Sequence, residues 1–300
     1  MINNYNFEKK FKLANISSTI LVVASLLMIF FKGLNFGIDF KGGTLIELRC
    51  DSTNIQISDV RASFNDLDLG DINVKEFGKK GDYLIKFERK SFDEKISIKS
   101  IKEKVASVLQ GNVDFRRVEN VGPKVSKELL ESGLLAISLA LAAMLFYIWV
   151  RFEWQFSIGS IIAIFHDVLI TIGLFSLLSL EINLSIVAAV LTIVGYSMND
   201  TVVIYDRIRE NLAKYSSLKI GEISNKSINE TLSRTIITSS TTLLALISIF
   251  ILGGEILKGF SLAMIIGVII GTYSSIFVAS PILKYFNVSF KTISKEKEKN

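Results

Sequence analysis

Ionisable side chains interrupt several stretches of the sequence that are otherwise apolar. His166 and Asp167 are adjacent in one such stretch. Asp200 follows Asn199 in the next, and Arg234 stands at the start of another. A charged side chain at the centre of a bilayer costs about 2.5–3.5 kcal/mol on insertion scales, so residues of this kind usually mark function. These five polar residues are therefore the candidates for chemistry inside a membrane.

Asp200 and Arg234 together have the chemistry of a proton-carrying site. Burial disfavours the charged form of a carboxyl and a nearby cation favours it, so movement of the cation becomes coupled to protonation. Plainer interpretations stay open. Arg234 could extend to the membrane interface, and His166 or Asp167 could serve only as a hydrogen-bonding group between packed helices.

The residues around Asp200 predict which side of its helix is buried. Thr192, Tyr196, Asn199, Asp200 and Val203 follow one helical face, and most of them are polar. Lipid tails cannot satisfy polar side chains. We therefore expect this face to look into a helix bundle and not at lipid.

Two later apolar stretches carry packing motifs. Arg234, Thr238 and Thr241 form a polar stripe at helical spacing, beginning with the cation. Gly267 and Gly271 form a GxxxG motif, which permits close approach of two helices. The second motif is common and predicts tight packing alone.

Six stretches are long and apolar enough to cross a bilayer, which takes about 20 residues. They are 13–31, 134–150, 156–179, 184–205, 235–252 and 259–283. The segment 32–133 holds 18 of the 34 Lys and Arg residues and 17 of the 29 Asp and Glu residues. This distribution predicts a membrane-embedded helical body with one polar insert, and it disfavours a soluble protein with buried helices. The first stretch ends in Phe30, Phe31 and Lys32 instead of small residues, which is typical of an uncleaved anchor.

Basic residues in the short connecting segments predict the orientation. The segments 1–12, 151–155, 206–234 and 284–300 together hold fifteen Lys and Arg residues. The alternate segments 180–183 and 253–258 hold only Lys258. By the positive-inside rule the N-terminal segment 1–12 and the tail 284–300 are cytoplasmic, and 32–133 lies on the opposite, periplasmic side.

The polar insert shows alternating strand and helix patterns. The expected elements, in the order βαββαβ, cover residues 44–51, 60–67, 72–77, 83–88, 98–109 and 113–118. This order predicts a small ferredoxin-like α+β domain with two helices on one antiparallel sheet. The insert contains no nucleophile–base pair, phosphate-binding loop or catalytic carboxylate cluster. A binding or force-transmitting module is favoured over an enzyme.

Composition excludes several kinds of site. Cys50 is the only cysteine, so neither an internal disulfide nor a cysteine-based metal cluster is available. His166 is the only histidine, which removes most histidine-ligated metal sites. The net charge of +5 is too small and too scattered to indicate nucleic-acid binding. We therefore predict no metal and no cofactor.

Several motifs together resemble the SecD/SecF family of protein-export membrane proteins, in its SecF branch. The run 37–44, with Gly37, Asp39, Gly42 and Gly43, resembles the family's GIDFxGGT signature, with Lys41 where members often have threonine. The run from Gly195 to Val203, which leads into 206–211, resembles the SecF form of the fourth span, and His166-Asp167 and Leu232-Ser233-Arg234-Thr235 match further family segments. The resemblance covers essentially the whole chain.

The resemblance implies a non-enzymatic subunit of the bacterial Sec machinery in the inner membrane. It implies work with SecD beside the SecYEG channel, together with YajC and YidC, on a translocating preprotein. The proton-motive force would complete translocation after SecA has acted, within a fold similar to half of a resistance-nodulation-division (RND) transporter. It assigns the proton role to Asp200 and Arg234, with His166 and Asp167 in support.

Two alternatives to this function remain. One is half of a proton-coupled RND-type efflux pump for small molecules, although an insert of this length leaves little room for the substrate-binding modules of such pumps. The other is a scaffold whose polar core only holds helices together. Under that hypothesis apolar replacement of Asp200 is neutral or stabilising.

Overall fold

The computed structural model describes residues 5–50, 55–65, 72–76, 79–87, 102–103, 105–107, 113–290 and 292. The chain divides into two compact units. The larger comprises Met1–Asn35 and Leu135–Asn300, and the smaller comprises Phe36–Leu134. Each unit has its own hydrophobic core.

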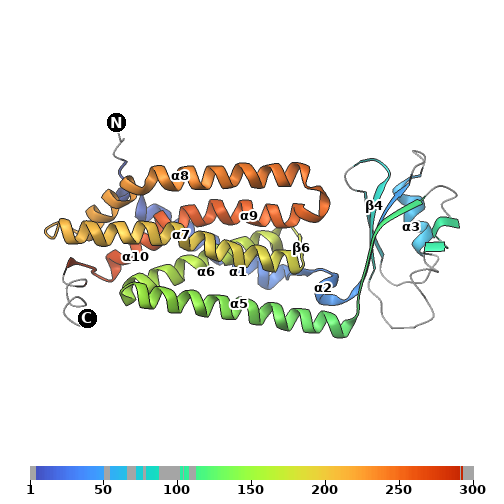
Figure 1. Ribbon diagram of the computed structural model, residues 1–300, viewed down its shortest axis with the longest axis horizontal. Coiled ribbons are helices and arrows are strands. Elements are labelled where there is room, and N and C mark those ends of the chain that lie inside the picture. The colour runs from blue at the N-terminus through green and yellow to red at the C-terminus, as the bar shows by residue number, and fades with distance from the viewer. Residues whose placement is uncertain are drawn as a thin grey trace. The chain divides into compact units, whose positions relative to one another are not determined.

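The larger unit is a bundle of long helices (Figure 1). Its helices are α1 (Glu8–Lys32), α5 (Pro123–Arg151), which starts in the smaller unit, α6 (Trp154–Leu177), α7 (Leu184–Lys214), α8 (Ile220–Leu252), α9 (Gly254–Ser274), the π-helix η1 (Ser275–Ala279) and α10 (Ser280–Tyr285). By length and composition, six helical segments of the described chain are candidate membrane spans. The chain is thus a multi-pass membrane protein.

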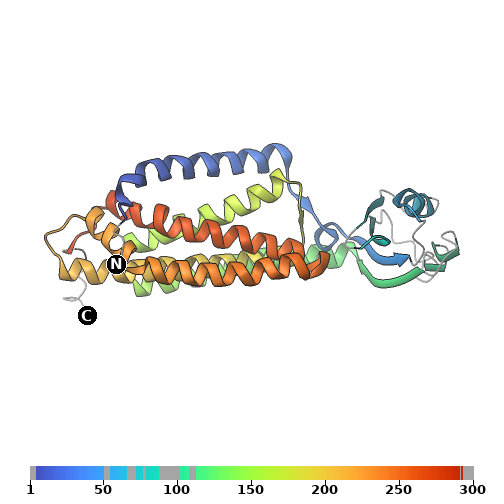
Figure 2. The same ribbon diagram turned by 90° about the horizontal axis from the view of Figure 1, so that it is seen from above.

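The helices differ in how much of their surface the chain itself buries. About half of the residues in the apolar parts of α6, α7 and the α9–α10 segment are buried, whereas α1, α5 and α8 are mostly exposed. Figure 2 shows these helices running roughly side by side along one direction. The exposed apolar residues, such as Phe30, Leu135 and Leu252, suit contact with lipid or with another membrane protein.

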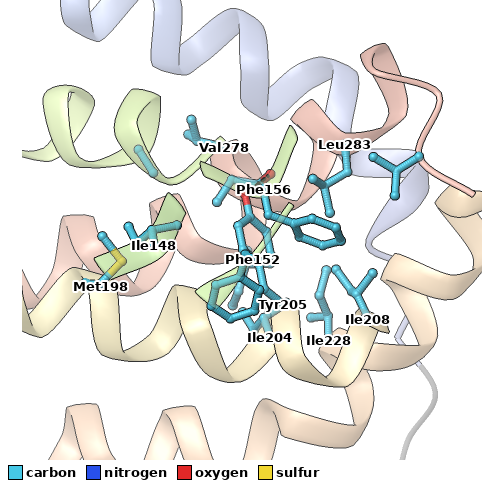
Figure 3. Close-up of a cluster of buried hydrophobic side chains, with 14 of the residues drawn as sticks. Ile148, Phe152, Phe156, Met198, Ile204, Tyr205, Ile208, Ile228, Val278 and Leu283 are labelled. Carbon is cyan, nitrogen blue, oxygen red and sulfur yellow. Dashed lines mark hydrogen bonds between the residues drawn. The ribbon is translucent and has the colours of Figure 1, made fainter. Parts of the chain in front are cut away.

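An aromatic cluster forms part of the larger core (Figure 3). The ring of Tyr205 on α7 lies 5.0 Å from that of Phe156 on α6, and 6.2 Å from that of Phe152. The Tyr205 hydroxyl donates a 2.9 Å hydrogen bond to the Ala279 carbonyl in η1. Gly159 leaves room for this hydroxyl, because a Cβ there would overlap it. The cluster therefore joins α6, α7 and η1 at one level.

The smaller unit contains one antiparallel sheet. Its main elements are β2 (Gly43–Cys50), α3 (Ile57–Asn65), β3 (Ile72–Glu76), β4 (Asp82–Phe87) and β5 (Val113–Val121), and the strand order is β3-β4-β2-β5. The short elements β1 (Asn35–Phe36) and α2 (Ile38–Lys41) precede them, and β6 (Glu181–Ile182) precedes α7. The predicted hairpin is confirmed, since β3 and β4 pair with Val74 opposite Ile85. The predicted helix 98–109 lies largely outside the described residues, of which 102–103 and 105–107 are helical.

Gly42 and Gly43 start the central strand in a conformation that favours glycine. Their φ angles are 80° and 144°. A Cβ on Gly43 would lie 2.6 Å from the carbonyl oxygen of Phe87 in β4. The two glycines therefore allow β2 to begin directly beside β4, which gives this part of the signature a structural role.

Asp82 forms an ion pair with two arginines among the described residues of the smaller unit. Its buried carboxylate accepts two 2.5 Å hydrogen bonds from Arg49, which is its partner in the β2–β4 register. The Arg116 guanidinium on β5 lies 3.7 Å from the same carboxylate. The hydrogen bonds from Arg49 hold the pKa of Asp82 below its ordinary value of 3.8, and the charge of Arg116 adds to the effect.

This pair predicts a pH-dependent stability of the sheet. Because the pKa is lower in the folded state, the stabilisation is complete above the unfolded value and is lost as pH falls through the folded value. Asp82→Asn should cost about 1–3 kcal/mol near neutral pH, and it should flatten the pH dependence below about pH 4. Hydrogen exchange of β2 and β4 amides in the full chain, at neutral and acidic pH, measures both effects. Equal acid sensitivity of variant and parent would contradict the prediction.

Candidate functional site

Asp200 is buried in the middle of α7. The residue is 4% exposed, and its Oδ2 atom has no hydrogen-bond partner among the described residues. The helix that carries it begins at a regular cap, where the Asn183 side chain accepts a hydrogen bond from the Ile186 amide. An acid with an unoccupied oxygen inside an apolar bundle is well placed to take up and release a proton.

Arg234 is exposed on α8 in this chain. Its charge acts on the Asp200 carboxyl. Within the described part of the chain, however, no ion pair of 4.0 Å or less joins the two residues. The structure thus brings Arg234 into electrostatic range of Asp200 without direct contact.

The threonines of the polar stripe on α8 form hydrogen bonds within their own helix. The hydroxyls of Thr238 and Thr241 donate hydrogen bonds to carbonyls one turn earlier in their own helix. Thr235 and Ser239 are the buried polar residues of this stretch, and Ser239 lies 2.7 Å from Thr272 on α9 and accepts a long hydrogen bond from Tyr196 on α7. Ser239 therefore links α8 to its neighbours, a role that the sequence analysis did not assign.

Asp167 is the centre of a buried polar cluster in the described part of the bundle. Its side chain on α6 is fully buried. The Oδ1 atom lies 2.8 Å from His166 Nδ1. The Oδ2 atom accepts hydrogen bonds from Ser197 on α7 at 2.5 Å and from Ser274 on α9 at 2.7 Å. One carboxylate thus connects three helices.

His166 extends this cluster towards α1. Its ring is stacked on that of Tyr273, with 6.1 Å between the centroids and 23° between the planes. The Tyr273 hydroxyl donates to the Ala14 carbonyl at 2.9 Å and lies 3.0 Å from the Ser18 hydroxyl. Because a carboxylate only accepts, His166 donates through Nδ1, and its buried Nε2 has no partner among the described residues.

The predicted inward face of α7 is wrong at two positions. Thr192 and Asn199 are exposed in this chain, and Tyr196 is half-buried. Thr192 satisfies its hydroxyl within its own helix, through the Ala188 carbonyl. Asp200 is buried because it lies next to another row of α7 residues, which is described below. The polarity of the sequence alone did not identify this row.

This buried row, which we call the α7 ladder, consists of Ile193, Ser197, Thr201 and Tyr205. These residues are spaced four apart and face a matching row of Gly267, Gly271, Ser275 and Ala279. A Cβ on Gly267 would overlap Ile193, and one on Gly271 would lie 3.0 Å from Ser197 Cβ. The hydroxyls of Thr201 and Ser275 are 2.8 Å apart. The tight packing predicted from GxxxG is confirmed, and α7 is its partner.

Sequence reasoning missed Ser197, Thr201 and Tyr273 as members of the polar core. Serine and threonine often donate to their own helix, so their presence in a span is weak evidence for a contact between helices. The available signal was the recurrence of small or hydroxylated residues every four positions in two spans. That pattern indicates close approach of two helices.

Comparison with known proteins gives two matches to family models. Residues 100–289 match the model described as protein export membrane protein SecD/SecF, C-terminal. Residues 27–53 match the SecD/SecF GG motif, which includes the glycine turn described above.

Curated relatives match nearly the whole chain. Protein translocase subunit SecF of Rickettsia bellii is 46% identical over 285 residues, which cover 94% of this chain and 92% of the relative. Protein translocase subunit SecF of Cereibacter sphaeroides is 45% identical over 280 residues, covering 90% and 86% of the two chains.

Solved structures of SecDF share the fold. The crystal structure of SecDF, a translocon-associated membrane protein from Thermus, superposes with a TM-score of 0.84 at 36% identity. The match covers 95% of this chain but only 39% of that one. SecDF in a super-membrane-facing form gives a TM-score of 0.70 at 34% identity, covering 99% and 40%. By the family models, by the identity of its relatives and by this shared fold, the chain belongs to the SecD/SecF family of protein-export membrane proteins.

Proposed function

We propose that this chain is an auxiliary, non-enzymatic subunit of the bacterial Sec translocase. With a SecD partner it uses the proton-motive force to complete translocation of preproteins after SecA has acted. The observation that carries this proposal is Asp200, a buried carboxyl with one unpartnered oxygen in the electrostatic range of Arg234. Family membership supplies the Sec context.

In this mechanism Asp200 takes up a proton and thereby loses its attraction for Arg234. No direct ion pair joins these two described residues, so the change of charge at Asp200 acts on Arg234, and through it on α8, across space. Asn199, His166 and Asp167 are the supporting polar residues. The shift of the helices is passed to the external domain, which acts on the preprotein.

A SecD partner also accounts for the exposed polar face of α7. Thr192 and Asn199 lie within an apolar helix and are exposed in this chain. Lipid would leave the Asn199 amide unsatisfied at a cost of several kcal/mol, on the order of 2–7, whereas a protein partner can hydrogen-bond to it. SecYEG, YajC and YidC follow as further partners from the family alone.

The location and domain arrangement belong to the same proposal. Both termini are cytoplasmic in the inner membrane, with membrane-crossing parts at 13–31, 134–150, 156–179, 184–205, 235–252 and 259–283. The segment 32–133 forms a periplasmic domain. Its strand order β3-β4-β2-β5 supports a ferredoxin-like fold, because the strands that flank the first helix are not neighbours in the sheet.

Reconstitution tests the function directly. Vesicles carrying SecYEG, SecA and the SecD partner, with or without this chain, would be loaded with a preprotein arrested late in export. We expect completion to require both this chain and a proton gradient, and to stop when an ionophore dissipates the gradient. Completion that is insensitive to the ionophore would contradict the proposal. Loss of drug efflux with normal protein export would instead favour the efflux pump.

Arg234 provides a residue-level prediction of the same mechanism. Arg234→Gln should remove the charge that acts on Asp200 and reduce gradient-dependent completion at least about tenfold, whereas Arg234→Lys should retain a measurable part of it. Lys284→Ala is a matched control, because this exposed cation forms only a surface ion pair with Glu8. Equal activity of the glutamine and lysine variants would show that charge at this position is not required.

A further inference from the structure

We infer that Asp167 is a positioning residue for Asp200, one that fixes the height and rotation of α7 in the bundle. This inference rests on the proposed function of Asp200. The Asp167 carboxylate holds one serine of α7 and one serine of α9 at the same oxygen. This carboxylate therefore links α6 by hydrogen bonds to α7 and α9, which pack closely against each other.

Ser197 connects this point to the proposed proton site. It lies three residues before Asp200, which is less than one helical turn. Thr201, the residue after Asp200, bonds to Ser275. Hydrogen bonds to neighbouring helices therefore hold α7 just before and just after Asp200 in the chain. Asp167 of α6 accepts the one before it, from Ser197.

His166 in turn holds the carboxylate of Asp167. The His166 Nδ1 atom is hydrogen-bonded to Asp167 Oδ1, and Asp167 Oδ2 accepts the hydrogen bonds of the two serines. Three hydrogen-bond partners therefore surround the Asp167 carboxylate and hold it in place. Asp200 is the opposite case, since its Oδ2 has no partner among the described residues. The two acids therefore divide the work of positioning and proton transfer.

Other charged or titratable side chains lie on the helices that pack against this part of α7. They are His166 and Asp167 on α6, Arg234 on α8 and Tyr273 on α9, with Tyr196 on α7 itself. Of these, Asp167 alone is hydrogen-bonded to the turn that precedes Asp200. Replacement of Asp167 should therefore change the environment of Asp200 while leaving the Asp200 side chain itself unaltered.

The test is an infrared titration of the full chain, purified with its SecD partner in vesicles. Asp200→Asn identifies the carbonyl stretching band of protonated Asp200 by its disappearance. We expect Asp167→Asn to leave this band present but to move its titration midpoint by about one pH unit. Ser197→Ala and Ser274→Ala should each move it in part. Ser261→Ala is the control, because this buried serine of α9 donates only within its own helix.

The outcomes separate this inference from the proposed function. If the band is present and Asp167→Asn leaves its midpoint unchanged, Asp167 does not position Asp200, although the proton role of Asp200 stands. If Asp167→Asn removes a second titrating band, Asp167 carries a proton itself and the inference is overturned. If Asp200→Asn removes no band, the proposed proton site fails, and the inference fails with it. If Asp167→Asn folds poorly, the titration midpoints of Ser197→Ala and Ser274→Ala test the inference in its place, and unchanged midpoints in both would overturn it.

Discussion

Replacing Asp200 with asparagine is expected to abolish the gradient-dependent stage of export while the SecA-driven stage continues. Asparagine has nearly the shape of aspartate but cannot gain or lose a proton at physiological pH. The variant should assemble with its partner in normal amounts, since no hydrogen bond to Asp200 Oδ2 is lost. Completion of an arrested preprotein, measured with and without an ionophore, should fall to the level seen without a gradient.

Asp206→Asn is the matched control for this experiment. It makes the same chemical change six residues further along α7, at an exposed carboxylate paired with Arg151 at the surface. Surface ion pairs contribute about 0–1 kcal/mol, so this variant should retain gradient-dependent export. Normal gradient-dependent completion by Asp200→Asn would refute the coupling role. Increased stability with normal export would support the scaffold hypothesis.

Substitution of Gly173 by alanine should cause a large structural defect in the bundle. Gly173 on α6 lies against Ser25 on α1, and a Cβ there would overlap the Ser25 side chain and lie 2.7 Å from its Cα. Because the obstacle includes backbone, α1 as a whole must move away. Overpacking of this kind costs about 1–3 kcal/mol. Thermal unfolding of the detergent-purified chain measures the effect.

Gly195→Ala is the corresponding control on α7. A Cβ at Gly195 would meet only the Met144 methyl group, at the ordinary contact distance of 3.6 Å. Alanine also favours a helix over glycine by about 1 kcal/mol. The Gly195 variant should therefore be as stable as the parent or slightly more so. Similar destabilisation by both alanines would indicate that Gly173 has no special packing role.

Hydropathy located the long helices but not where they begin. The apolar stretch 134–150 corresponds to the later part of α5, which starts eleven residues earlier at Pro123. About half of the residues between are polar, including Lys124 and Lys127, and most of them are exposed. An exposed helical turn has no apolar signal, so a hydropathy scale cannot distinguish it from a loop. Proline at the first helical position was the better indicator.

The sequence was enough to identify the acidic residues of the candidate site, but it was not enough to identify the side chains that contact them. Single buried acids such as Asp167 and Asp200 stand out because few charges occur in apolar stretches. Their partners do not stand out, because the sequence does not say which way a hydroxyl points. Ser197 reaches across to Asp167, whereas Thr192, five residues earlier, bonds to its own helix. Only the packing of α6 against α7 decides between these two outcomes.

The α7 ladder restricts how these two helices can move past one another. The four residues of α7 and their counterparts on the α9–η1 segment keep a constant separation of 74 positions along the chain. Sliding by less than a full turn of about 5.4 Å would drive Ile193 and Ser197 off their glycines and into larger neighbours. Small gradual slippage is therefore blocked. The two helices can therefore move together as one rigid body, or shift relative to each other by a full turn, so a small displacement of α7 is passed directly to the α9–η1 segment.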